Sequence, residues 1–146
     1  MTGNRETIAI ASDHAGVDLK ETLKGALQEL DFTPLDLGTN GSASVDYPDF
    51  ADRLAQALAD GKARRGVLVC GTGIGISIAA NRHRHIRAAL VHDMTSARLT
   101  RQHNDANVLC LGARLIGVDV AKDCLRVFLE TDFEGGRHQN RVAKLG

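Results

Sequence analysis

The segment Cys70-Gly-Thr-Gly-Ile-Gly75 places a thiol directly before a glycine-rich stretch. Residues 66–69 are apolar or glycine, so the pattern predicts a buried strand that ends at Cys70 and then turns into a helix. Helix N-termini favour the thiolate form of cysteine, which could act as a nucleophile or a general base. The amides of the turn could bind an oxyanion, and they belong to Gly71, Thr72, Gly73, Ile74 and Gly75.

Three familiar glycine loops do not fit this segment. A Walker A loop needs a lysine after its last glycine, and none is present. The dinucleotide fingerprint needs Gly or Ala where Ile76 stands, and a phosphatase loop needs an arginine nearer to the cysteine than Arg82. Two simpler interpretations stay open: the glycines could serve only a tight turn, and Cys70 could be a small buried residue. Cys110 and Cys124 lie in apolar patterns that favour the second interpretation for them.

Cations gather near the C-terminus of the chain. Arg137 and Arg141 are four residues apart, which places them on one face of a helical turn, with His138 beside them. Two guanidinium groups with an imidazole suit a phosphate dianion, and Arg114 is a further candidate cation. A solvated basic tail is the alternative interpretation.

Two of the six histidines stand beside polar partners at predicted element ends. His14 follows Asp13 and His103 precedes Asn104, and both placements suit proton transfer near neutral pH. No histidine or cysteine spacing resembles a zinc site, so we expect no metal. The segment with His83 and His85 favours a solvated connection, and His92 is a weaker candidate.

The elements that must position these residues alternate between strand and helix. Apolar runs predict strands over 7–11, 33–37, 66–70, 86–91 and 107–111. Helical spacing predicts helices over 19–30, from 46 to Gly61, over 75–81, over 95–103 and over 118–129, the last one burying Val118. Such β-then-α units indicate one α/β domain, residues 1–146, with a doubly wound parallel sheet. Ligands bind at the carboxyl ends of such strands, which selects residues 12–14, 70–75 and 92–93.

Composition excludes several classes of function. Lys plus Arg and Asp plus Glu are balanced at 18 each, and Trp is absent, which argues against a nucleic-acid or membrane partner. No apolar run approaches the length of a membrane span or a signal peptide. Three cysteines at long spacing do not form a disulfide framework, so we expect a reduced, cytoplasmic setting.

Together, these groups point to one kind of chemistry. A thiolate base, an oxyanion-binding loop, imidazoles and a phosphate clamp suit proton abstraction beside a carbonyl on a small phosphorylated substrate, through an enediolate. Isomerisation between an aldose and a ketose is the simplest such reaction.

Five segments resemble the ribose-5-phosphate isomerase B family, which includes galactose- and allose-6-phosphate isomerases. They are SDHAG, DYPDFA, CGTGIGISIAANR, RQHNDANVLCLGAR and EGGRHQNRV, and they occur in order over nearly the whole chain. The resemblance implies a Rossmann-like αβα sandwich with a five-stranded parallel sheet. It also implies a homodimer, sometimes a tetramer, with active sites at the interface, a phosphorylated sugar as substrate, and neither metal nor cofactor.

The resemblance also implies roles for single residues. Cys70 resembles the base that moves a proton between C1 and C2, with Thr72 assisting and the loop amides holding the enediolate. Some relatives use a glutamate at the position of Ile76 instead, so this chain is similar to the cysteine type. His103 resembles the residue that opens the sugar ring, supported by Asp13, with Asn104 on sugar oxygens.

The phosphate ligands implied by the resemblance are Arg137, Arg141 and Arg114, with His14 adjacent, and the tail of about residues 131–146 contributes to this site and to the dimer. His138 and Tyr47 line the same site. The preferred sugar stays open among four, five and six carbons. A non-catalytic sugar-phosphate-binding module and a redox-sensing thiol protein are the alternatives from other classes.

Overall fold

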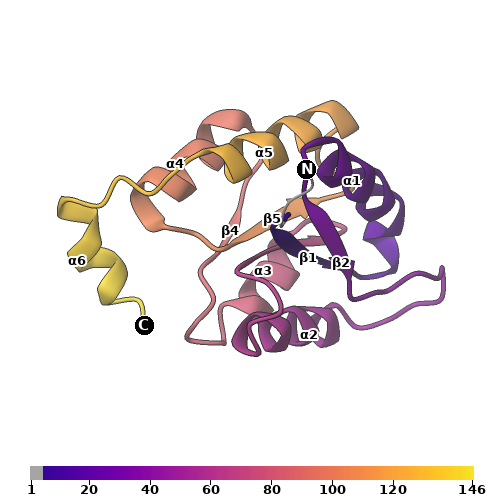
Figure 1. The fold of residues 1–146 in the computed structure, drawn as a ribbon. Coiled ribbons are helices and arrows are strands. Elements are labelled where there is room, and N and C mark those ends of the chain that lie inside the picture. The colour runs from indigo at the N-terminus through magenta and orange to yellow at the C-terminus, as the bar shows by residue number, and fades with distance from the viewer. Residues whose placement is uncertain (1–4) are drawn as a thin grey trace.

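A computed structural model describes residues 5–146, which form a single α/β domain around a five-stranded sheet (Figure 1). All neighbouring strands are parallel, in the order β2-β1-β3-β5-β4. The carboxyl ends of β1 and β3 are therefore neighbours, whereas β4 is an edge strand. The strand bounds are β1 Thr7–Ser12, β2 Thr33–Asp36, β3 Arg65–Cys70, β4 Ala88–Leu90 and β5 Val108–Gly112.

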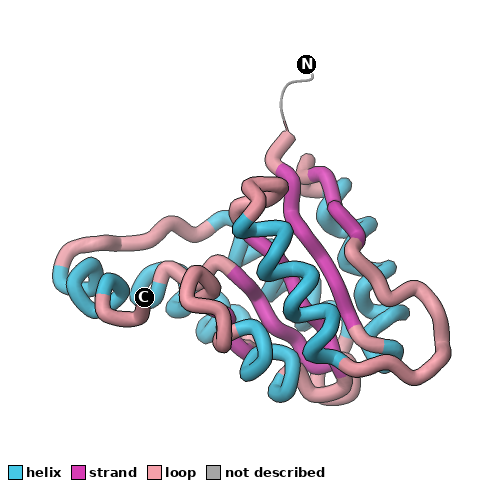
Figure 2. Tube along the Cα trace, turned by 90° about the horizontal axis from the view of Figure 1, so that it is seen from below, coloured by secondary structure: helices cyan, strands magenta, loops and turns pink. Residues whose placement is uncertain are grey.

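Helices cover both faces of the sheet, as the alternating pattern predicts (Figures 1 and 2). One face carries α1 (Val17–Glu29), α4 (Met94–Asn104) and α5 (Val118–Glu130), and the other carries α2 (Tyr47–Ala59) and α3 (Ile74–Ala80). Side chains alternate along each strand, so that Ile8 and Ile10 pack on the first face and Ala9 and Ala11 on the second. A short 3-10 helix, η1 (His14–Gly16), links β1 to α1.

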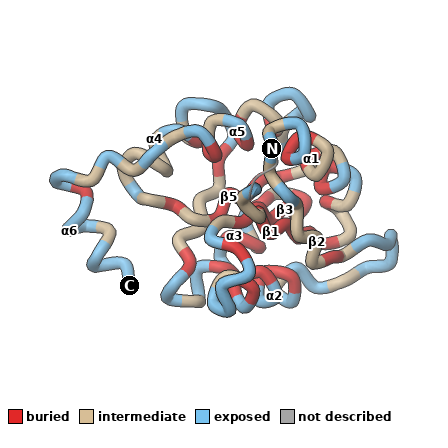
Figure 3. The backbone as a smooth tube through the Cα atoms, viewed as in Figure 1, coloured by how far each residue is buried: buried red, intermediate tan, exposed pale blue. Residues whose placement is uncertain are grey.

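The last helix, α6 (Arg137–Ala143), stands away from the sheet and is largely exposed, in contrast to the buried strands (Figure 3). It is attached to the end of α4, where the Glu134 amide donates to the Gln102 carbonyl over 3.1 Å. Its mostly polar surface explains why it does not pack into the core. Within the described part of the chain, no helix has the length and apolar character needed to cross a membrane.

The structure differs from the predicted elements at several of their ends. Val118 is 51% exposed, because it begins α5, and the buried stripe of that helix starts one turn later at Ala121. The fourth strand is shorter than the apolar run 86–91, since β4 is an edge strand that pairs only over Ala88–Leu90. The second strand ends at Asp36, one residue before the predicted end.

Candidate active site

The thiol of Cys70 lies at the end of β3, beside the centre of the sheet, and is 4% exposed. Its Sγ accepts a hydrogen bond of 3.1 Å from the amide of Gly73. Gly73 has φ +77°, and a Cβ there would lie 2.5 Å from the Leu90 side chain and 2.9 Å from the Leu111 backbone. Only glycine fits these two constraints, and in this conformation its amide points at the sulfur.

The remaining loop residues hold the start of α3. Thr72 Oγ1 accepts the amide of Ile74 over 3.1 Å, and Arg114 donates its amide to the Gly71 carbonyl over 2.9 Å. The Arg114 side chain follows the same loop, because a Cβ on Gly71 would lie 3.4 Å from its Nη1. A positive charge therefore stands beside the glycine loop.

Residues from the turn after β1 and from the start of α2 complete this cluster. Asp13 is 7% exposed, and its Oδ1 accepts the amides of Ala15 and Gly16 at 3.0 and 3.2 Å. His14 Nδ1 accepts the amide of Val45 over 3.1 Å. Tyr47 packs against the loop so closely that a Cβ on Gly75 would meet its ring at 2.5 Å. We call the set formed by Asp13, His14, Tyr47, Arg114 and residues 70–75 the thiol cluster.

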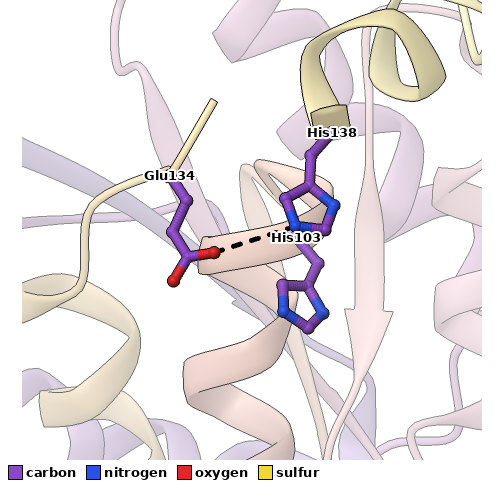
Figure 4. A group of neighbouring side chains, drawn as sticks. All are labelled: His103, Glu134 and His138. Atoms are coloured by element: carbon purple, nitrogen blue, oxygen red, sulfur yellow. Dashed lines mark ion pairs between the residues drawn. The ribbon is translucent and has the colours of Figure 1, made fainter. Parts of the chain in front are cut away.

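A second cluster, the tail cluster, lies where α6 meets the end of α4. A hollow of about 300 Å³ is lined there by His103, Asn104, His138, Arg141, Val142 and Leu145. The rings of His103 and His138 are stacked, with centroids 4.5 Å apart and an angle of 18° between their planes. Glu134 Oε1 is 3.7 Å from His138 Nε2. Figure 4 shows these side chains and marks the contact with a dashed line.

The charge around this hollow favours an anion. Burial lowers the pKa of His138 below its usual value of 6.5, and the nearby His103, Arg137 and Arg141 lower it further. His103, Glu134 and His138 have ligand atoms within 4.8 Å of one another, which is close enough for a metal ion. Arg137 and Arg141 add positive charge beside the hollow, which suits a phosphate group.

The two clusters lie at opposite ends of the strands, the thiol cluster at the carboxyl ends and the tail cluster towards the amino ends. Cys70 is at the carboxyl end of β3, whereas α4 runs back against the strands and places His103 and Asn104 near the start of β5. Within one chain, Asp13 therefore cannot support His103, and Arg114 is separated from Arg137 and Arg141. The structure brings together the predicted residues of each cluster but does not bring one cluster to the other.

The third predicted locus does not join either cluster. His92 is exposed at the end of the edge strand β4, with β5 between it and Cys70. Asp93 caps α4, with its Oδ1 accepting the Ser96 amide over 2.7 Å. His83 contacts Asp52 over 2.8 Å on the surface, as a solvated connection would.

Sequence reasoning missed two charged residues near these clusters. Glu134 is separated from His138 by one helical turn, and that spacing could have indicated their contact. Lys20 is fully buried, although it is a lysine in a polar stretch of α1. Lys20 lies three and seven residues before the buried Leu23 and Leu27, so it is on the same face of α1 as the apolar stripe. This spacing could have indicated that Lys20 is buried.

The other two thiols are core residues. Cys110 and Cys124 are both 0% exposed and unpaired. Burial raises the pKa of Cys124 to about 11, and it raises the pKa of Cys110 further. Neither thiol is therefore available as a thiolate near neutral pH, which confirms their interpretation as small buried residues.

Comparisons with known proteins show which family this sequence and fold belong to. The model of a family described as ribose/galactose isomerase matches residues 8–145. The chain is 46% identical to ribose-5-phosphate isomerase B of Escherichia coli (strain K12) over 92% of its own length and 91% of the relative's. It is 45% identical to D-erythrulose-4-phosphate isomerase of Pectobacterium atrosepticum, over 96% and 93%. A crystal structure of a ribose 5-phosphate isomerase from Thermotoga maritima superposes with a TM-score of 0.94, at 48% identity over 97% and 98% of the two chains.

Proposed function

Because this chain belongs to the ribose/galactose isomerase family of sugar-phosphate isomerases, we propose that it interconverts D-ribose 5-phosphate and D-ribulose 5-phosphate with Cys70 as the base. The observation that carries the role of Cys70 is the hydrogen bond from the Gly73 amide to Sγ, because it stabilises negative charge on the sulfur.

In the proposed reaction, the thiolate removes the C2 proton of the open-chain aldose and returns it to C1. The O2 hydroxyl proton moves to O1, so the atoms and electrons balance within the sugar and no redox partner is needed. The cis-enediolate formed between these steps carries negative charge on its oxygens. Two loop amides are already occupied, by Cys70 Sγ and Thr72 Oγ1, so we assign the enediolate to the amides of Gly71, Thr72 and Gly75.

We propose that each active site is shared by two subunits of a dimer. Ring opening by His103 and proton transfer by Cys70 act on adjacent atoms of one sugar, yet in one chain the two residues lie at opposite ends of the strands. A two-fold dimer can place the thiol cluster of one subunit against the tail cluster of the other. The exposed Ile74, Ile78 and Leu145, at 49%, 52% and 59%, offer apolar surface for this contact.

The same pairing would complete the phosphate site. His14 and Arg114 belong to the thiol cluster, whereas Arg137 and Arg141 belong to the tail cluster, and both arginines are exposed in the single chain. Across the two-fold axis, all four could contact one phosphate group. His138 would line the sugar side of the site, and Tyr47, against Gly75, would close the opposite side.

The length of the sugar is tested by a panel of aldose phosphates with four, five and six carbons, ranked by kcat/KM. We expect ribose 5-phosphate to rank first. A higher value for erythrose 4-phosphate would move the assignment towards the activity that the Pectobacterium relative is named for, and a higher value for allose or galactose 6-phosphate would move it to six carbons. No turnover of any sugar, with retained binding, would favour the non-catalytic module.

A further inference from the structure

Lys20 is a charged residue with no access to solvent, and all its hydrogen-bonding capacity is used. Its side chain is 0% exposed, and Nζ lies 2.7 Å from Asp36 Oδ2, 2.6 Å from Asn40 Oδ1 and 3.3 Å from Glu21 Oε2. An ammonium group has three protons to donate, and three acceptors surround it. Replacing a buried ion pair by well-packed apolar residues is often neutral or stabilising, so stability alone does not account for a lysine at this position.

Asp36 is the partner that connects Lys20 to the end of β2. Its Oδ2 also accepts from Lys24 Nζ over 2.9 Å, and its Oδ1 accepts the amide of Gly38 over 2.8 Å. Burial alone would raise the pKa of Asp36, but the hydrogen bonds from the two lysines and from Gly38 lower it below its usual value. Asp36 is therefore an ionised anchor at the start of the segment that follows β2.

The segment 39–46 crosses from β2 to α2, and residues 40–44 are exposed. At its start, the Thr39 amide donates to the Ser12 carbonyl over 2.8 Å, and the side chain of Asn40 accepts from Lys20. At its far end, the amide of Val45 donates to His14 Nδ1 over 3.1 Å. Asn40 and Val45 thus tie the two ends of an otherwise exposed segment to buried or half-buried side chains.

The bond from Val45 determines the state of the His14 ring. Because Nδ1 accepts this hydrogen bond, the proton of the neutral imidazole is on Nε2, which can then donate to a ligand. Displacement of Val45 would release Nδ1, and the ring would then exchange between its two tautomers.

We propose that Lys20 is a positioning residue that holds segment 39–46 through Asn40, so that Val45 keeps His14 as a donor towards the substrate phosphate. This inference rests on the proposed function only for the identity of the substrate. Lys20 does not touch the sugar, and its effect passes through Asn40, the segment and His14.

The first test is Asn40→Ala, which removes the acceptor but leaves the Lys20–Asp36 ion pair in place. We expect KM for ribose 5-phosphate to rise about three- to ten-fold, the size of one net hydrogen bond, with kcat within about two-fold of wild type. Asn40→Asp keeps an acceptor oxygen at the same place and should restore KM. Lys24→Ala is the matched control, since Lys24 binds the same Asp36 without contacting the segment.

The second test does not depend on turnover. Ring ¹⁵N chemical shifts of His14, assigned by their loss in His14→Ala, should show the Nε2–H tautomer in the wild type and a mixture in Asn40→Ala. Lys20→Met should give the same mixture if it folds, which circular dichroism would establish.

An unchanged KM, or an unchanged His14 tautomer, in Asn40→Ala would overturn the positioning role. The same KM increase in Lys24→Ala would also overturn it, because it would show a general effect of weakening the ion-pair cluster. If the wild type turned over no sugar phosphate, the proposed function would fail, while the ¹⁵N shifts would still decide the inference about Lys20.

Discussion

The shared active site makes a quantitative prediction for mixtures of two inactive variants. Cys70→Ala removes the proposed base, and His103→Ala removes the proposed ring-opening residue. In one chain, α4 has 11 residues and extends about 16 Å back along the sheet, so its C-terminal His103 is far from the carboxyl end of β3. General acid–base groups must approach within about 3 Å of the atoms they serve, so one chain cannot supply both groups to one sugar.

The expected magnitude follows from the symmetry. Random exchange of equal amounts of the two variants makes about half of the dimers mixed. Each mixed dimer has one site with both lesions and one site with neither, so it has half the activity of a wild-type dimer. The mixture should therefore recover about a quarter of the wild-type activity, whereas each variant alone should be nearly inactive.

The assay is the rate of ketose phosphate formation after the variants are unfolded and refolded together, compared with the same proteins refolded separately. The double variant Cys70→Ala/His103→Ala is the matched control. Mixed with an equal amount of wild type, it should halve the activity on exchange, because each mixed dimer then has one lesion in each site. Activity that stays at the level of the separate variants, in a mixture shown to contain mixed dimers, would refute the shared site.

Three further predictions follow from single contacts. Cys70→Ser keeps an acceptor for the Gly73 amide but loses the thiolate, so kcat should fall about 10²- to 10⁴-fold with little change in KM. A variant with more than about a tenth of wild-type kcat would show that Cys70 is not the general base. Arg137→Ala and Arg141→Ala should chiefly raise KM and weaken inhibition by inorganic phosphate, and unchanged inhibition would count against the clamp. Folding lowers the pKa of His138, so protonation of this residue favours the unfolded state, and stability should be lost as pH falls below about 6.5. His138→Gln should therefore flatten the dependence of Tm on pH between about 5 and 7. An unchanged slope would contradict this reasoning.

Much of the fold could be predicted because its signals are local. The apolar run that ends at Cys70 and the helical spacing from Leu19 to Leu27 each depend on residues within a few turns of one another, and both elements are confirmed. The ends of elements were less accurate. Val118 fits the apolar stripe of α5 by spacing, but it lies in the first turn, where no neighbouring element covers it.

The order of the strands could not be predicted from the pattern. Pairing of β3 with both β1 and β5 depends on contacts between segments far apart in the chain, and parallel neighbours are joined only through helices. This order makes β1 and β3 neighbours and puts β4 at the edge. It therefore decides that Asp13 and His14 join Cys70, and that His92 does not.

The sequence by itself determined the local chemistry: Cys70 and the amide of Gly73 are three residues apart, so a short turn is enough to bring them together. The four-residue spacing of Arg137 and Arg141 is likewise sufficient to place both on one face of α6. Only the tertiary structure decided what depends on the path of the chain through space. The antiparallel course of α4 separates His103 from Cys70, and the packing of β2 and segment 39–46 over α1 buries Lys20. Both outcomes depend on non-local packing, which residue types and spacing along the chain do not specify.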